Sequence, residues 1–170
     1  ARSRGHGRVR VVGWRDVNQA GQSLAERWDA LNEVVRCLWA KYGAEPEGEY
    51  FTLTLESPLI LRDACLHPLR PDDLDAESFG LPTGVERRRM MLSEVLLQGW
   101  NAAWHLPKRD TPALGIGSVF LFRVPAWQRD GVLSRLKEIE RTGLGEQPSE
   151  GFGRVRACDP FHYCFEEVGK

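Results

Sequence analysis

Apolar side chains recur at helical spacing between residues 23 and 43. Ser23 and Glu26 form a capping box that begins this segment, and Gly43 is a stop signal at its end. The apolar positions that share one face are Leu24, Trp28, Leu31, Val35, Leu38 and Tyr42. The spacing predicts a helix whose apolar stripe packs in the core, with Cys37 as a small core residue beside it.

Farther along the chain, apolar residues predict strands. Residues 50–61 alternate between apolar and polar side chains, and residues 117–124 (GSVFLFRV) predict a largely buried strand. Residues 90–98 fit either a strand or a short helix. A last strand is expected where aromatic residues alternate, at Phe161, Tyr163 and Phe165.

A second helix is predicted over residues 125–142, where Leu133, Leu136 and Ile139 would face inward. Glycines follow its end, so the expected order is strand, helix, glycine loop and strand. This is the order of the second half of a ferredoxin-like unit. Proline and glycine recur through residues 62–89, which predicts a long loop that is either functional or partly mobile.

Two segments near the ends of the chain repeat one motif. Residues 3–11 read SRGHGRVRV and residues 149–157 read SEGFGRVRA, so six of nine positions are identical. The chain opens inside this motif and without a methionine. We therefore expect a piece of a longer polypeptide that starts at the end of one unit and runs to the end of the next.

Each copy of the motif suits an anionic ligand. Glycines permit positive φ and close approach of a ligand, and their N–H groups can line an anion-binding concavity. The R-V-R that follows alternates like a strand, so its two arginines share one face. A phosphate chain would fit such a surface. A plain turn before an amphipathic edge strand also explains a single copy.

Charge and composition narrow the classes of function. Residues 1–15 carry five arginines and no acid, although the whole chain has a net charge of −1, and this asymmetry predicts a local anion-binding surface. No apolar run approaches the roughly 20 residues of a membrane helix, and no signal peptide is recognisable. Four cysteines without a C-x-x-C pair favour a reducing compartment, so a cytoplasmic protein without a membrane partner is expected.

Groups that could support catalysis or bind a metal do not form a convincing set. His105, near Lys108 and Arg109, is a candidate for acid–base cleavage of RNA. The cysteine and histidine spacings lack the usual zinc pattern, at Cys65-x-His67 and Cys158-x3-His162-x-Cys164. We expect no catalytic residue, no metal and no cofactor.

Several segments resemble the RAMP superfamily of CRISPR-associated proteins. Residues 143–155 are similar to its glycine-rich loop, and residues 1–11 resemble the same loop closing a preceding unit. The segments 51–63, 99–108 and 117–124 are similar to the second unit of the RAMP subunit of subtype III-D effector complexes.

The resemblance implies a non-catalytic subunit that binds CRISPR RNA, at its repeat-derived 5′ tag, in a type III interference complex. Its partners would be the large signature subunit and the backbone RAMP subunits. The RNA-binding residues implied by the two loops are Gly5, His6, Gly7, Arg8, Gly151, Phe152, Gly153 and Arg154. Positive charge and stacking capacity add Arg2, Arg4, Arg10, Trp100, Lys108, Arg109 and Arg156. The resemblance of the Gly-Trp-Asn segment adds Asn101.

The predicted fold is α+β, with a ferredoxin-like (RRM-like) RAMP unit. Residues 1–15 would be the glycine loop and terminal strand of a preceding unit, and residues 16–49 a helix and linker. Residues 50–170 would form the second unit, with an inserted loop at 64–92. Two other functions remain open: a RAMP endoribonuclease that uses His105 or His6 on precursor RNA, and a protein-only scaffold.

Overall fold

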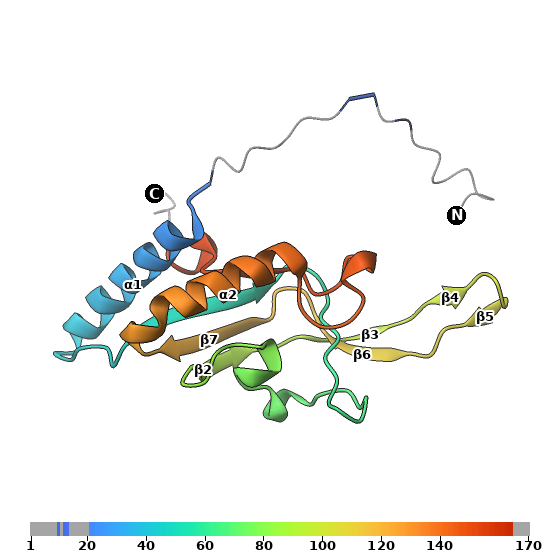
Figure 1. The fold of residues 1–170 in the computed structure, drawn as a ribbon, viewed down its shortest axis with the longest axis horizontal. Helices are drawn as coiled ribbons and strands as arrows, with labels where there is room; N and C mark the ends of the chain where they lie inside the picture. Colours follow the sequence, from blue (N-terminus) through green and yellow to red (C-terminus); the bar gives the residue numbers. More distant parts are fainter. Residues whose placement is uncertain (1–9, 11, 14–20, 165–170) are drawn as a thin grey trace, which may run out of the picture.

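The computed structural model describes residues 10, 12–13 and 21–164, and it confirms an α+β fold (Figure 1). The central sheet is antiparallel, with the strand order β2-β7-β1-β8. In that order the strands are Glu86–Met91, Val119–Val124, Glu49–Leu55 and Val155–Ala157. Two α-helices of the described part, α1 (Leu24–Lys41) and α2 (Arg129–Thr142), lie across one face of this sheet.

Helix α1 begins where the sequence predicts. Ser23 Oγ accepts a hydrogen bond from the Glu26 N–H, and the Glu26 carboxylate accepts one from the Ser23 N–H at 2.6 Å. The first half of the apolar stripe is buried, at Leu24, Trp28 and Leu31. The core prediction is wrong for the second half, where Val35 is half-buried and Cys37, Leu38 and Tyr42 are exposed. The reason is that the last turns of α1 extend beyond α2 and β7 (Figure 1).

Aromatic side chains from both layers form the centre of the core. Phe51 of β1 stacks on Trp28 of α1 with 5.3 Å between ring centroids, and on Phe122 of β7 with 5.1 Å. The predicted alternation of residues 50–61 places Phe51 and Leu53 in this core, although the strand itself ends at Leu55. Helix α2 adds the three inward residues that its spacing predicts, Leu133, Leu136 and Ile139.

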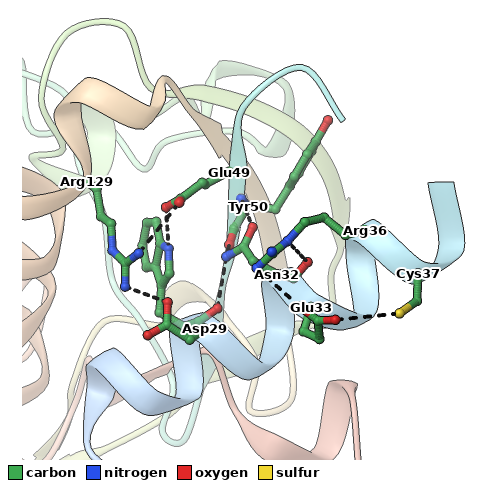
Figure 2. Close-up of polar contacts among 9 residues, drawn as sticks. Asp29, Asn32, Glu33, Arg36, Cys37, Glu49, Tyr50 and Arg129 are labelled. Carbon is green, nitrogen blue, oxygen red and sulfur yellow. Dashed lines mark hydrogen bonds and ion pairs between the residues drawn. The ribbon is translucent and has the colours of Figure 1, made fainter. Parts of the chain in front are cut away.

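Asn32 joins α1 to the sheet (Figure 2). Its Nδ2 donates to the carbonyl oxygen of Tyr50, and its Oδ1 accepts from the Tyr50 N–H, both at 2.8 Å. Strand β8 pairs only with residues 53–55 of β1, so Asn32 satisfies backbone groups of β1 beyond the end of β8. Beside it, Arg129 of α2 forms an ion pair with Asp29 of α1, which links the two helices.

The segment predicted as a loop over residues 64–92 contributes both a strand and core side chains. Residues 86–91 form β2, which pairs with β7 at the edge of the sheet. Leu74 and Phe79 are buried in the core; Leu74 follows one 3-10 turn, and Phe79 is the last residue of another. The loop prediction is wrong for β2 because this edge strand has the sequence ERRRMM, whose charged residues hide the alternation typical of a strand.

Residues 93–115 form a long hairpin, here called the arm, which projects away from the sheet and helices (Figure 1). Its base pairs β3 (Glu94–Leu97) with β6 (Thr111–Leu114), and its tip pairs β4 (Trp100–Asn101) with β5 (Leu106–Pro107). Residues 90–98 therefore contain strand rather than helix.

The predicted last strand over residues 161–165 is wrong. Asp159 Oδ1 accepts a hydrogen bond from the Phe161 N–H and begins a 3-10 turn, so Phe161 is exposed whereas Tyr163 is buried. Phe165 lies outside the described residues. The strand that follows the glycine loop is β8, so the order strand, helix, glycine loop and strand is confirmed by β7, α2 and β8.

Candidate nucleic-acid interface

Residues 143–153 form the glycine loop, which packs closely on the chain around Pro58. The Gly153 N–H donates to the Pro58 carbonyl at 2.8 Å, and the Gly153 carbonyl accepts from the Leu144 N–H at 2.8 Å. Gly153 has φ +72°, and an added Cβ would lie 1.8 Å from the Leu144 carbonyl oxygen. Only glycine fits this position without moving the backbone.

The amides of the two motif glycines are occupied within the protein. The Gly151 N–H donates to the Pro148 carbonyl at 3.0 Å, and the Gly153 N–H is bound as described. The predicted anion-binding concavity is therefore not formed by these two amides. Gly151 differs from Gly153 in its surroundings, because a Cβ added there meets nothing within 4 Å. A ligand can thus approach the loop at Gly151, beside the half-buried Phe152.

The two arginines after the loop differ in solvent exposure and in the acidic residue beside them. The Arg154 side chain is 72% exposed, with Glu56 at 3.8 Å, whereas the Arg156 side chain is 40% exposed and lies 3.5 Å from Asp159. Both line a groove between the start of α1, α2 and β8. The other charged residues that line this groove are Glu26, Arg27, Glu56, Lys137, Glu140 and Arg141. The groove carries both signs of charge, with an excess of cations.

The arm presents aromatic surface at its tip. Trp100 and Trp104 are 60% and 75% exposed, so neither is a core residue. Asn101 Oδ1 accepts hydrogen bonds from the N–H groups of Ala103 and Trp104, at 3.0 and 3.2 Å. Asn101 therefore shapes the turn that follows Trp100 and contains Trp104.

Cations accompany these aromatic side chains. Lys108 and Arg109 are exposed, and residues 99–109 contain no acid. The Lys108 N–H donates to the Gly99 carbonyl at 2.8 Å, and its aliphatic stem lies across Gly99. His105, at the turn, is also exposed, and it has φ +52°. The tip combines flat apolar rings with positive charge, which is the combination that binds single-stranded nucleic acid without sequence preference.

The glycine loop and the base of the arm meet at the same segment. Leu59 exchanges both backbone hydrogen bonds with Leu114 of β6, each at 2.9 Å. Gly145, with φ +70°, lies so close that an added Cβ would be 2.2 Å from the Ile60 carbonyl oxygen and 2.7 Å from Leu59 Cδ1. The loop and the arm therefore lie at one end of the molecule, as Figure 1 shows.

Aromatic residues of the sheet are not available for stacking on bases. Phe51, Phe120 and Phe122 of β1 and β7 are fully buried beneath the helices. An RRM-like domain binds bases with aromatic side chains of its sheet surface. In the described part of this chain, two exposed tryptophans lie close together on the arm, whereas Tyr42, Trp127 and Phe161 are exposed elsewhere.

The first copy of the motif lies almost entirely outside the described residues. Arg2, Arg4, Gly5, His6, Gly7 and Arg8 all fall there. Arg10 is described and exposed. The structure thus places Gly151, Phe152, Gly153, Arg154 and Arg156 at one site and Trp100, Asn101, Lys108 and Arg109 on the arm.

Comparison with known proteins adds no relative: no family model matches the chain, and no curated protein matches it. Among residues 21–164, no helix combines the length and apolar character needed to cross a membrane.

Proposed function

We propose that this chain is a non-catalytic CRISPR RNA-binding subunit of a type III (III-D-like) interference complex. The observation that carries the proposal is the arm, on which Trp100 and Trp104 are exposed beside Lys108 and Arg109. The base of the arm also pairs with the segment on which the glycine loop packs, through Leu114 and Leu59. Sequence features that resemble RAMP proteins therefore coincide in space with a surface suited to RNA.

The topology agrees with a ferredoxin-like unit that has been altered. Strands β7 and β8 flank β1 and are joined by α2, as expected for a split βαβ unit. Residues 56–85, between β1 and β2, form 3-10 turns in place of the expected helix. Helix α1, which precedes β1, packs beside α2 on the sheet and covers part of the core surface that the missing helix would cover.

In this proposal, the arm binds RNA by stacking and charge. Each base stacked on a tryptophan contributes about 1–3 kcal/mol, largely regardless of the base. Lys108 and Arg109 would pair with phosphates, and Arg154 would extend the path of the backbone toward the groove. The glycine loop acts by its compact shape, because it holds the segment around Leu59 with which the base of the arm pairs. Large and backbone Cas subunits would cover other surfaces of the chain, in the cytoplasm.

The RNA that accompanies the protein tests this function. The chain would be purified together with the products of neighbouring genes, and the bound RNA sequenced. We expect RNA of defined length whose molecules share one repeat-derived 5′ sequence. An assembled complex without RNA would contradict the proposal and favour a protein-only scaffold.

The endoribonuclease alternative makes a different prediction. The isolated chain would be incubated with precursor RNA in the presence of a chelator. We expect no cleavage, and the same result for His105→Ala. Metal-independent cleavage that disappears in His105→Ala would replace the proposed role by that of a processing nuclease.

A further inference from the structure

A short hairpin at residues 62–68 brings three side chains with metal-binding atoms together. Arg62 and Pro68 form an isolated β-bridge, and the Asp63 N–H donates to the His67 carbonyl at 2.9 Å. Leu66 takes φ +65°, which turns the chain back within this hairpin. One ligand atom each from Asp63, Cys65 and His67 then lie within 4.8 Å of one another.

The Asp63 carboxylate is oriented by the backbone of the hairpin. Its Oδ1 accepts hydrogen bonds from the Cys65 and His67 N–H groups, both at 2.8 Å. Its Oδ2 lies 3.3 Å from His67 Nδ1. The two amides thus hold one carboxylate oxygen in place, while the other oxygen faces the imidazole. Hydrogen bonds from neighbouring groups orient the ligands of known metal sites in the same way.

The distances between the ligand atoms suit a metal ion with tetrahedral coordination. Bonds of about 2.0–2.3 Å place the ligand atoms of a tetrahedral zinc site about 3.3–3.8 Å from one another. The pair from Asp63 and His67 is already at this separation, and all three side chains are exposed and able to rotate. Arg62 lies nearby, but its guanidinium is bound to the Leu66 carbonyl and to Glu146.

We propose that Asp63, Cys65 and His67 bind a divalent transition metal ion, with Zn²⁺ preferred and a fourth position open to water. A thiolate, an imidazole and a carboxylate are the donor set that zinc accepts. This site is separate from the proposed RNA-binding function and does not depend on it. Cys65 and His67 alone lack a zinc pattern in the sequence, and Asp63 joins them only through the turn.

Cobalt(II) tests the site, because thiolate ligation produces an intense near-ultraviolet absorption band. The reduced chain would be titrated with cobalt(II) in a buffer free of thiols, and Zn²⁺ then added. We expect one cobalt ion per chain, with the thiolate band, and displacement of cobalt by zinc. Absence of the band in the wild-type chain would overturn the proposal.

Variants identify the ligands. Cys65→Ser should remove the band, and Asp63→Asn should weaken affinity by about tenfold or more. The asparagine keeps an oxygen that can accept the two amide hydrogen bonds, so it removes the charge without removing the turn. Cys37→Ser and Cys164→Ser are matched controls, since both cysteines are exposed and lie outside the hairpin. A band that persists in Cys65→Ser, or is lost in either control, would refute this assignment.

Discussion

Asn32 of α1 binds both backbone groups of Tyr50 in β1, so a helix side chain takes the place of a neighbouring strand. The side chain and the strand residue are both buried, at 5% and 7% exposure. Asn32 also donates to the Trp28 carbonyl at 2.9 Å, which holds its amide in one orientation. This contact fixes the position of α1 on the sheet, in a fold where the residues between β1 and β2 form 3-10 turns and no α-helix.

Replacing Asn32 should therefore destabilise the protein. Asn32→Ala leaves a buried N–H and a buried carbonyl of Tyr50 without their partner, and each unsatisfied group costs about 1–3 kcal/mol. We expect the free energy of unfolding to fall by about 2 kcal/mol or more, measured by urea denaturation. The neighbouring exposed residue provides a control, because Glu33→Ala should change stability by about 0.5 kcal/mol or less. Equal effects of the two substitutions would show that the Asn32 contact adds no stability.

The glycine loop should respond differently at its two motif glycines. In Gly153→Ala the new Cβ would meet the Leu144 carbonyl oxygen, so the backbone must shift and the melting temperature should fall strongly. In Gly151→Ala only the positive φ is unfavourable, at a cost of about 1 kcal/mol. Thermal unfolding of both variants measures the difference. Similar melting temperatures would mean that the packing of Gly153 on Leu144 is not tight in solution.

For measurements of RNA binding, Gly151→Ala is the suitable loop variant, because it leaves the packing of the loop in place. Gly153→Val would disrupt the fold and would therefore also lose RNA binding. Its loss of RNA binding cannot distinguish a ligand contact of Gly153 from a structural role. Arg154→Lys is the companion variant, because it keeps the positive charge of an exposed side chain.

The four cysteine thiols should differ in reactivity, with one protected and three accessible to an alkylating reagent. Burial raises the pKa of the Cys158 thiol to about 12, so it remains protonated at pH 8 and also at pH 10. The thiolate is the reactive form, and the side chain is fully buried. Mass spectrometry after alkylation should find Cys37, Cys65 and Cys164 modified in the folded protein, and Cys158 modified only after unfolding. Early modification of Cys158 would contradict its burial in the core.

The sequence predicted those elements whose conformation depends on residues close together in the chain. The capping box at Ser23 and the helical spacing of Leu133, Leu136 and Ile139 located α1 and α2. The alternation around Phe51 located β1, because one face of that strand is buried. These signals are the periodicity of apolar residues and the capping residues of helices, and both can be recognised in a single sequence.

Other parts depend on tertiary contacts that no local pattern contains. Strand β2 is an edge strand rich in arginine, and its pairing with β7 decides its conformation. Tyr42 was expected in the core because its spacing is helical, but the end of α1 extends past the sheet. The sequence predicted positive φ at the motif glycines, but not that Pro148 and Pro58 would occupy their amides.

Binding of RNA should depend on ionic strength as well as on the arm. Contacts of Lys108, Arg109 and Arg154 with phosphates release counterions, so affinity should fall steeply as salt concentration rises. Lys108→Ala combined with Arg109→Ala should reduce the slope of log affinity against log salt by about 1–2. The slope can be measured by fluorescence anisotropy with a labelled single-stranded RNA. An unchanged slope would exclude phosphate contact by these two residues.

The most direct test of the RNA-binding account compares exposed tryptophans on and off the arm. Trp100→Ala combined with Trp104→Ala removes the stacking surface, and Trp127→Ala removes a tryptophan that is 80% exposed at the start of the α2 region. With single-stranded RNA, the arm variant should lose affinity by at least about tenfold, because each stacked ring contributes about 1–3 kcal/mol. Trp127→Ala should bind like the wild-type chain. If the arm variant keeps full affinity, or Trp127→Ala loses as much, the arm is not the RNA-binding surface.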